Sequence, residues 1–342
     1  MTNIVDHLPN TNDTALIDTN GKALSYQELK TAVGKLAGGL NDMGIEPGDR
    51  VVLLIPMSID LYVALLAIFH IGATATLIDP AANVKGILDQ YKPDGLIGVP
   101  KAHLLRLKVP ALRGLKAYVS TGFTPLPHRQ LKHLSGESIP VGPADSPALL
   151  TFTSGTTGAP KAIARSHAFL LNQHRVLGEH MTLDATDVDL PTLPVFLLHS
   201  LASGATCIIA NADLKNVGQV NPAPIVVQIN QHGVTSTSGS PAFFRRLVDH
   251  LLKTKQTLPT LKHIYTGGAR VPASLVDDLI KALPHTALHV VYGSTESEPI
   301  AVLDARAHRE KLLQTAGRGA LVGTPVSAIK VRIEAKESGD KF

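Results

Sequence analysis

Apolar runs and amphipathic segments alternate along most of the chain, and this alternation predicts the fold class. Continuous apolar runs are typical of strands buried on both faces, whereas apolar residues recurring every three or four positions indicate helices. The expected strands are residues 51–55, 74–78, 95–99, 149–152, 206–210, 225–229, 263–266 and 288–292. The expected helices are residues 26–43, 61–71, 242–253 and 273–283. Strands that alternate with helices form mostly parallel sheets covered on both faces, so the pattern predicts a doubly wound α/β fold.

Length and composition narrow this picture. A chain of 342 residues exceeds one small core, so we expect about two domains, and 44% hydrophobic with 18% charged residues indicates a folded protein. The formal net charge of +4 suits anionic substrates such as nucleotides. No block of Lys and Arg and no basic groove with interleaved aromatics is evident, so a nucleic-acid partner is disfavoured.

Three features of the chain concern its cellular location. The N-terminal residues lack a basic region and an apolar core, so no signal peptide is expected. The most apolar window, residues 61–78, is interrupted by His70, and we interpret it as a buried helix leading into a strand instead of a transmembrane segment. Cys207 is the single cysteine and lies in an apolar run, which indicates a buried thiol. Together these features favour a cytoplasmic protein.

The most informative stretch is the octet Ser-Gly-Thr-Thr-Gly-Ala-Pro-Lys at residues 154–161, which follows an apolar strand. Glycines allow the backbone to approach a ligand closely, hydroxyls donate hydrogen bonds, and Lys161 adds a positive charge. The octet is not a Walker A loop, because Pro160 stands where that motif has glycine. We therefore expect a phosphate-binding loop of another kind at the end of a strand.

Two further segments follow expected strands. Tyr292-Gly293-Ser294-Thr295-Glu296 combines an aromatic ring for stacking, a backbone without a side chain, a hydroxyl donor and a carboxylate that suits Mg²⁺. Residues 266–269, Thr-Gly-Gly-Ala, offer a surface on which a flat ring could lie. Each segment alone is also typical of an ordinary turn, so their meaning depends on their combination with the octet.

The octet, the Gly-Gly-Ala segment and the Tyr-Gly-Ser-Thr-Glu segment occur in the order seen in the adenylate-forming superfamily. This superfamily includes acyl-CoA synthetases, luciferases and the adenylation domains of peptide synthetases. Residues 23–29 resemble its early helix entry, residues 44–51 a turn into a strand, and residues 323–325 the turn before its small barrel. The resemblance covers about residues 20–335.

The resemblance implies that a carboxylate attacks the α-phosphate of ATP, so that an acyl-adenylate forms and pyrophosphate leaves. It assigns the phosphates and Mg²⁺ to one set of residues, with Glu296 on the metal, Thr295 on the α-phosphate and Lys161 on the β- and γ-phosphates. The other residues that it assigns to ATP are Ser154, Gly155, Thr156, Thr157 and Gly158 in the octet, and Gly267, Gly268, Ala269, Tyr292 and Gly293 around the adenine. Phe196, Gly239 and Ser240 would border the acyl pocket.

Within the superfamily, four stretches look most like fatty-acyl-CoA ligases, and among these like the β-lactone synthetases of bacterial olefin biosynthesis. The stretches are residues 78–80, 97–103, 238–243 and 296–301. The implied substrate is a fatty or β-hydroxy fatty acid. The sequence does not specify the acceptor, which is CoA, an internal hydroxyl or a carrier protein. Where the superfamily often has His after an aromatic residue, Leu197 follows Phe196 here. We interpret the nearby His199 as a structural histidine.

The end of the chain departs from the superfamily pattern. Full-length members continue with a ribose-binding aspartate, a hinge and a small C-terminal domain that carries a catalytic lysine. This sequence stops after an expected first barrel strand, residues 328–334, and Ser338-Gly339-Asp340 follows residues 323–325 too soon to be the ribose motif. We therefore expect an N-terminal domain with a truncated barrel remnant and no C-terminal domain.

By analogy with the superfamily, residues 47–175 form one α/β subdomain that ends in the phosphate loop. Residues 1–46 with 176–320 form a second one with the adenine and acyl sites, and residues 321–342 form the barrel remnant and tail. The function expected first is ATP-dependent activation of a carboxylic acid. The alternatives are an impaired ATP- or acyl-binding module, one half of a split enzyme whose C-terminal domain is a separate chain, and a structural scaffold.

Overall fold

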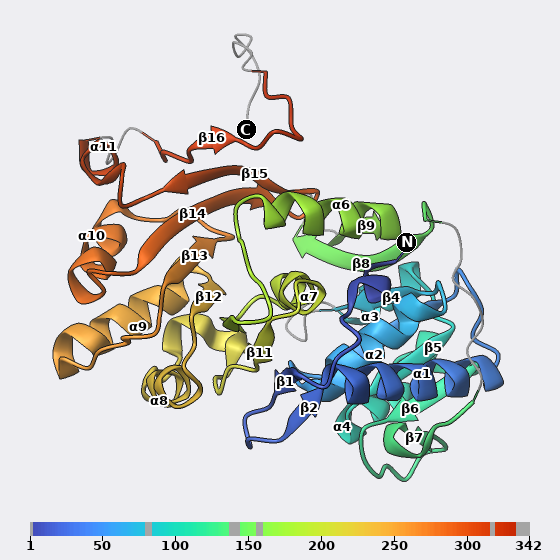
Figure 1. Ribbon diagram of the computed structural model, residues 1–342. Coiled ribbons are helices and arrows are strands. Elements are labelled where there is room, and N and C mark those ends of the chain that lie inside the picture. Colours follow the sequence, from blue (N-terminus) through green and yellow to red (C-terminus); the bar gives the residue numbers. More distant parts are fainter. Residues whose placement is uncertain (1–2, 79–83, 137–143, 155–159, 315–318, 333–342) are drawn as a thin grey trace.

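The computed structural model describes residues 3–78, 84–136, 144–154, 160–314 and 319–332. Within these residues the strands form two sheets, one of seven strands and one of nine, which lie side by side with helices around them (Figure 1). Most neighbouring strands in both sheets are parallel. The predicted α/β fold with two mostly parallel sheets is therefore confirmed.

The seven-stranded sheet is parallel except at β8 and β9, which pair antiparallel. Its order is β7 (Arg129–Gln130), β6 (Ala117–Ser120), β5 (Gly95–Gly98), β3 (Arg50–Leu54), β4 (Thr74–Leu77), β8 (Pro147–Ser154) and β9 (Pro160–Ser166). The elements that connect its strands are α2 (Ile59–His70), α3 (Val84–Gln90), α4 (Pro100–His103), α5 (Leu105–Lys108), η2 (Pro110–Leu112) and η3 (Leu131–His133).

The nine-stranded sheet is parallel from β14 to β1 and antiparallel at both ends. Its order is β16 (Thr324–Pro325), β15 (Ser297–Asp304), β14 (Ala287–Ser294), β13 (His263–Gly267), β12 (Ser236–Gly239), β10 (Val188–Pro191), β11 (Thr206–Ile208), β1 (Thr14–Ile17) and β2 (Ala23–Ser25). The remaining helices are η1 (Ile4–His7), α1 (Tyr26–Asp42), α6 (His167–Gly178), α7 (Pro194–Ala202), η4 (Leu214–Gln219), α8 (Ala223–His232), α9 (Pro241–Thr254), α10 (Ala273–Ala282) and α11 (Arg309–Gln314).

Helix α1 begins at a capping box, ends before a glycine and buries one face in the core. The Ser25 hydroxyl accepts a hydrogen bond from the Glu28 amide at 3.1 Å, and the Glu28 carboxylate accepts one from the Ser25 amide at 2.8 Å, which is a capping box. Gly44, at a φ of 84°, follows the end of the helix as expected. The buried face of α1 packs against α2, and Tyr26 donates to the carbonyl of Ala205 at 2.7 Å.

The largest apolar core joins the two sheets. It contains side chains from α1, β3 and α2 together with side chains from α7 and β11. Side chains of α1 belong to this shared core. The expected boundary at residue 46 between two subdomains therefore stays a prediction. Helix α2 is buried almost all around and leads into β4, as expected for residues 61–78, and Cys207 is a buried free thiol. No helix in the described part of the chain is long and apolar enough to cross a membrane.

Two expected strands are wrong. Residues 225–229 lie within α8, where Ile225, Val226 and Ile229 are buried while Val227 is 57% exposed. This burial pattern is helical, but a short continuous apolar run in the sequence does not distinguish a helix from a buried strand. Residues 328–332 form no strand, and residues 333–334 lie outside the described residues. The free edge of β15 pairs with β16 instead, and the described residues contain no closed barrel.

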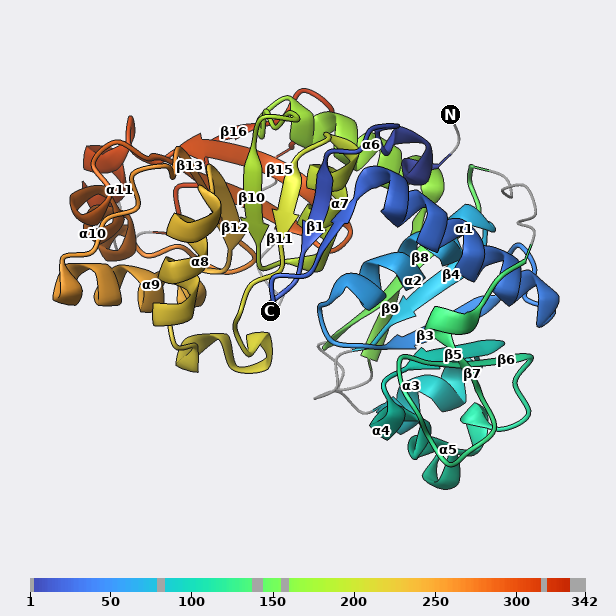
Figure 2. The same cartoon turned by 60° about the horizontal axis from the view of Figure 1, so that its bottom comes forward.

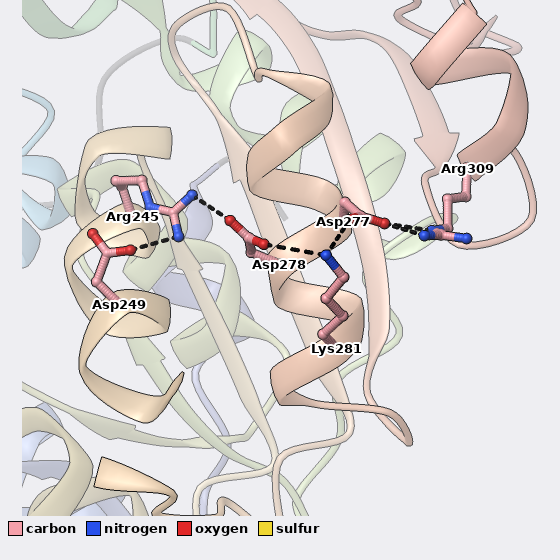
Figure 3. Close-up of polar contacts among 6 residues, drawn as sticks. All are labelled: Arg245, Asp249, Asp277, Asp278, Lys281 and Arg309. Atoms are coloured by element: carbon pink, nitrogen blue, oxygen red, sulfur yellow. Dashed lines mark hydrogen bonds and ion pairs between the residues drawn. The ribbon is translucent and has the colours of Figure 1, made fainter. Parts of the chain in front are cut away.

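The nine-stranded half contains two polar networks. The first joins α9, α10 and α11 at the surface: Asp277 pairs with Lys281 and Arg309, while Asp278 pairs with Lys281 and Arg245, which also contacts Asp249 (Figure 3). These ion pairs are partly exposed, so they order the three helices without a large contribution to stability. The second network surrounds a buried acid in β10.

Asp189 is fully buried in β10, and its carboxylate accepts a hydrogen bond from the Ser200 hydroxyl at 2.5 Å. Burial raises the pKa of Asp189 from 3.8 to about 6. The native state therefore holds a proton that the unfolded chain releases, and the free energy of unfolding falls as the pH rises through this window. We expect Asp189→Asn to exceed the parent chain in stability above pH 6, by about 3 kcal/mol at most, and to lose this advantage near pH 4.

Urea denaturation of both chains at several pH values measures this difference. Asp184→Asn is the matched control, because Asp184 is an exposed acid on the same connection to β10, and its pKa is lowered by hydrogen bonds from Thr186. If the stability difference between Asp189→Asn and the parent is the same at every pH, Asp189 does not titrate as described.

Candidate functional site

Two segments that are far apart in sequence meet between the sheets. Lys161 lies near the start of β9 in the seven-stranded sheet, and Glu296 lies in the turn between β14 and β15 of the nine-stranded sheet. The Lys161 Nζ and Glu296 Oε1 atoms are 3.1 Å apart. The two side chains are 65% and 49% exposed, so both remain accessible to a ligand. The last residue of the octet thus contacts the last residue of the Tyr-Gly-Ser-Thr-Glu segment.

The rest of the octet joins β8 to β9. Ser154 is the last residue of β8 and pairs in register with Pro160 at the start of β9. The predicted phosphate-binding residues Gly155, Thr156, Thr157 and Gly158 lie outside the described residues. The flanking strands nevertheless fix the octet at the carboxyl end of β8, as its position after an apolar run predicted.

The Glu296 carboxylate is ionised at neutral pH. The hydrogen bond from Lys161 lowers the pKa of Glu296 below its ordinary value, and the backbone amide of Glu296 acts in the same direction. A half-exposed carboxylate of this kind suits Mg²⁺, which usually binds one or two carboxylates and takes its other ligands from water and substrate phosphates. Among the described residues there is no group of three His, Cys, Asp or Glu side chains able to hold a metal by themselves. The site thus fits a metal that arrives with phosphate.

Arg165, which the sequence analysis did not select, also connects β9 to the Tyr-Gly-Ser-Thr-Glu segment. It lies on β9, is only 5% exposed, and its Nε donates a hydrogen bond to the Thr295 carbonyl at 3.0 Å. Its Nη1 is buried without a hydrogen-bond partner among the described residues. Burial raises the pKa of the neighbouring Glu298 carboxyl, and the positive charge of Arg165 opposes that rise. A buried cation on one sheet therefore holds the turn that the other sheet contributes.

One sequence signal could have revealed Arg165. Lys161, Ile163 and Arg165 alternate along β9 and share one face of the strand. A strand was not expected at residues 160–166, because this stretch has no continuous apolar run and contains two cations.

The Gly-Gly-Ala segment lies beside Tyr292 at the carboxyl end of the nine-stranded sheet. Gly267 ends β13 and pairs with Val291 of β14, one residue before Tyr292. A Cβ at Gly267 would lie 2.3 Å from the Val291 carbonyl oxygen, so no side chain fits there. Gly268, at a φ of 75°, and Ala269 are exposed, and the Tyr292 side chain is 46% exposed. The predicted adenine-binding residues therefore lie next to one another at the carboxyl ends of β13 and β14, and only Gly267 among them is buried.

Gly293 lies against the same turn that Arg165 holds. A Cβ at this position would lie 3.0 Å from the Cγ of Glu298 and 3.1 Å from its Cβ. A side chain at residue 293 would therefore press against Glu298, so glycine allows β14 and β15 to approach closely at this turn.

The three residues expected at the acyl pocket lie deeper in the nine-stranded half. Phe196 is 3% exposed and packs in a small apolar cluster that includes Tyr265 and Val291. Gly239 ends β12, and a Cβ there would lie 2.6 Å from the Thr192 hydroxyl. The Ser240 hydroxyl caps α9 by accepting from the Phe243 amide at 3.3 Å. Ser240 thus has a structural role in addition to any contact with a substrate.

His199 has the structural role that we expected. It is buried, its Nδ1 lies 2.9 Å from Nδ1 of His174, and its Nε2 lies 3.2 Å from the Met181 carbonyl. Both ring nitrogens are therefore engaged by protein atoms.

Comparison with known proteins identifies the family of the chain. Residues 7–341 match the family of AMP-binding enzymes. The chain is 32% identical to an olefin beta-lactone synthetase of Stenotrophomonas maltophilia over 324 residues, 91% of this chain and 58% of that protein. It is 29% identical to a long-chain-fatty-acid–CoA ligase of Thermus thermophilus, over 92% of this chain and 60% of the relative. The chain thus spans less than two thirds of the length of these relatives.

Two solved structures have the same fold. An amide bond synthetase from Marinactinospora thermotolerans superposes with a TM-score of 0.81 at 22% identity, covering 99% of this chain and 67% of that one. A long-chain-fatty-acid–CoA ligase from Archaeoglobus fulgidus superposes with a TM-score of 0.78 at 21% identity, over 95% of this chain and 69% of that chain.

Proposed function

Because the chain belongs to the family of AMP-binding enzymes, we propose that it takes part in the ATP-dependent activation of a carboxylic acid. In this reaction a carboxylate oxygen attacks the α-phosphorus of ATP, the bond to the bridging oxygen breaks, and pyrophosphate leaves. The products are an acyl-adenylate and pyrophosphate. The protein contributes by positioning the reactants and by neutralising the charge that the phosphates carry.

The observation that carries the proposal is the contact between Lys161 and Glu296 at 3.1 Å. It joins the octet to the Tyr-Gly-Ser-Thr-Glu segment across the two sheets. A triphosphate needs cationic donors on its oxygens, and Mg²⁺ needs a carboxylate, so one cation and one anion at the same place suit a Mg²⁺-bound nucleotide. Lys161 would hold phosphate oxygens and Glu296 would hold the metal.

The other contacts to ATP would come from residues near Lys161 and Glu296. The Thr295 hydroxyl would bind the α-phosphate, and Arg165 would position it through the hydrogen bond to the Thr295 carbonyl. Ser154, Gly155, Thr156, Thr157 and Gly158 would surround the β- and γ-phosphates. The adenine would lie between Tyr292 and the open backbone of Gly268 and Ala269.

The substrate class that we propose is a fatty or β-hydroxy fatty acid. Relatives whose names specify an olefin beta-lactone synthetase and a long-chain-fatty-acid–CoA ligase support this class. The apolar cluster around Phe196 includes Tyr265 of β13 and Val291 of β14, and an apolar chain bound next to it would avoid water. The acceptor would be CoA or the substrate's own hydroxyl.

Gly267→Ala tests the adenine assignment. The new Cβ would clash with the Val291 carbonyl, so β13 and β14 must separate just before Tyr292. We expect the dissociation constant for ATP to rise about ten-fold, measured by calorimetry with Mg²⁺. Gly34→Ala is the matched control, because no atom lies within 4 Å of a Cβ at that helical position. ATP affinity equal to that of the parent would remove Gly267 from the adenine site.

The experiment that tests the proposed function is pyrophosphate release with ATP, Mg²⁺ and a panel of acids. We expect release that depends on the acid and is fastest with long-chain or β-hydroxy acids. ATP binding without acid-dependent release would instead identify a binding module. Faster release with short or aromatic acids would exclude the fatty-acid class but retain the reaction.

A further inference from the structure

One segment of the chain carries all of its excess positive charge. Residues 95–136 contain seven Lys and Arg residues and no Asp or Glu. The other residues hold 25 of the 32 basic and all 28 of the acidic side chains. The modest net charge of +4 therefore conceals a strongly basic segment on an otherwise slightly acidic protein.

This segment forms the outer end of the seven-stranded half. Helices α4 and α5 lie at the lower end of the seven-stranded half in Figure 2, near strands β5, β6 and β7 at one edge of that sheet. The loop at residues 121–128 joins β6 to β7 at this edge. Arg106 ties the loop to α5, because its Nη1 donates to the Pro127 carbonyl at 2.8 Å. Its guanidinium also lies 3.5 Å above the ring centre of Tyr118. The loop and the two helices thus form one surface.

Large apolar side chains are exposed on this surface. Leu104 is 46% exposed, Leu107 60% and Phe123 76%, which is the highest value among the exposed large apolar residues described. The Phe123 ring lies 6.3 Å from that of His128, which in turn lies 6.2 Å from His103, the residue before Leu104. These contacts place the three apolar side chains on the same end of the molecule.

Exposed cations lie on the same elements as these apolar residues, or directly after them in sequence. Lys101 and Lys108 are exposed on α4 and α5, and Arg129 and Lys132 are exposed just after the loop. Lys116 is occupied by an ion pair with Asp49 at 2.7 Å, so it is not counted among them. We call Lys101, Leu104, Leu107, Lys108 and Phe123 the basic apolar face.

We propose that the basic apolar face binds the surface of a membrane that contains anionic lipids. Leucine and phenylalanine side chains enter the boundary between headgroups and acyl chains, while flanking lysines attract anionic headgroups. A nucleic acid would use the cations but would leave Leu104, Leu107 and Phe123 exposed to water. The combination of both kinds of side chain, with no carboxylate in the segment, therefore favours a lipid surface.

This inference goes beyond acid activation and does not depend on it. A membrane contact would place the protein next to the phase in which long-chain acids dissolve. Because vesicle binding is measured without ATP or acid, its failure would leave the proposed reaction untouched.

The test is flotation of the full chain with vesicles of phosphatidylcholine alone or with about 30 mol % phosphatidylglycerol. We expect binding to the anionic vesicles, weakened at about 0.5 M salt because the charges are screened. The variant Leu104→Ser/Leu107→Ser/Phe123→Ser should bind about ten-fold or more weakly, and so should Lys101→Glu/Lys108→Glu. Circular dichroism establishes that each variant is folded.

Val227→Ser/Leu252→Ser is the matched control, because these residues are 57% and 44% exposed on α8 and α9, away from the basic apolar face. It should bind vesicles like the parent. Equal binding to both vesicle types, or full binding by the triple serine variant, would overturn the proposal. Binding to a single-stranded oligonucleotide that survives the triple serine substitution would identify nucleic acid as the partner instead.

Discussion

Replacing Glu296 by glutamine is expected to lower acid-dependent pyrophosphate release by about 10²–10³-fold. The variant keeps the size of the side chain but removes the negative charge that Lys161 balances at 3.1 Å. Since a neutral amide is a poor ligand for Mg²⁺, the Mg²⁺ concentration at half-maximal rate should also rise. Rates measured over a range of Mg²⁺ concentrations separate the loss of metal affinity from a loss of the chemical step.

Asp249→Asn is the matched control for this charge removal. Asp249 is 53% exposed and pairs with Arg245 at 2.6 Å on α9, so it resembles Glu296 in exposure and pairing but lies outside the site. It should release pyrophosphate at the parent rate. A Glu296→Gln chain as active as this control would mean that Glu296 does not hold the metal.

Replacing Arg165 by methionine should lower the rate about 10–100-fold, with a smaller change in the KM for the acid. The substitution removes a charged hydrogen bond to the Thr295 carbonyl, worth about 1.5–3 kcal/mol, and leaves Glu298 without its neighbouring cation. Because Arg165 acts through the turn and not on the substrate, the loss should appear mainly in kcat. Arg165→Lys should recover part of it, because lysine retains the charge and a donor.

Two further variants distinguish positioning from a general loss of stability. Glu298→Gln combined with Arg165→Met should be less impaired than Arg165→Met alone, because no unpaired, partly buried carboxylate remains. Arg175→Met, at a 58% exposed position paired with Glu179, should leave kcat unchanged. If Arg165→Met changes only the midpoint of unfolding, Arg165 is a structural residue and does not position Thr295.

The pattern of apolar residues was sufficient for the fold class but not for every element. Buried parallel strands such as β3 and β5 are continuous apolar runs, so their positions could be predicted within a residue or two. Strand β12 was missed, because its sequence Ser-Thr-Ser-Gly is typical of a loop. Its residues are all buried, and Thr237 donates to the Leu190 carbonyl at 2.7 Å, so hydrogen bonds from neighbouring strands replace the apolar signal.

The site could be predicted in part. The three motifs each begin in the last residues of a strand, and the carboxyl ends of parallel strands meet at one edge of a sheet, so their neighbourhood could be anticipated. The contact of Lys161 with Glu296 joins two different sheets, which no local pattern specifies. Arg165 could be suspected only from the alternation along β9, and Glu298 from no local pattern, because their importance lies in contacts with residues more than 100 positions away in sequence.

The basic apolar face was missed for a different reason. A total charge of +4 averages over the whole chain, and exposed apolar residues cannot be distinguished from buried ones in a sequence. The fold was needed to place Leu104, Leu107 and Phe123 at one end of the molecule.

The most direct test of acid activation is the exchange of radiolabelled pyrophosphate into ATP. This exchange needs the acid, ATP and Mg²⁺ but no acceptor, so it does not depend on whether CoA or a hydroxyl completes the reaction. We predict exchange that requires a long-chain or β-hydroxy acid and is lost in Glu296→Gln. ATP binding with no acid-dependent exchange would contradict the proposal that this chain activates carboxylic acids.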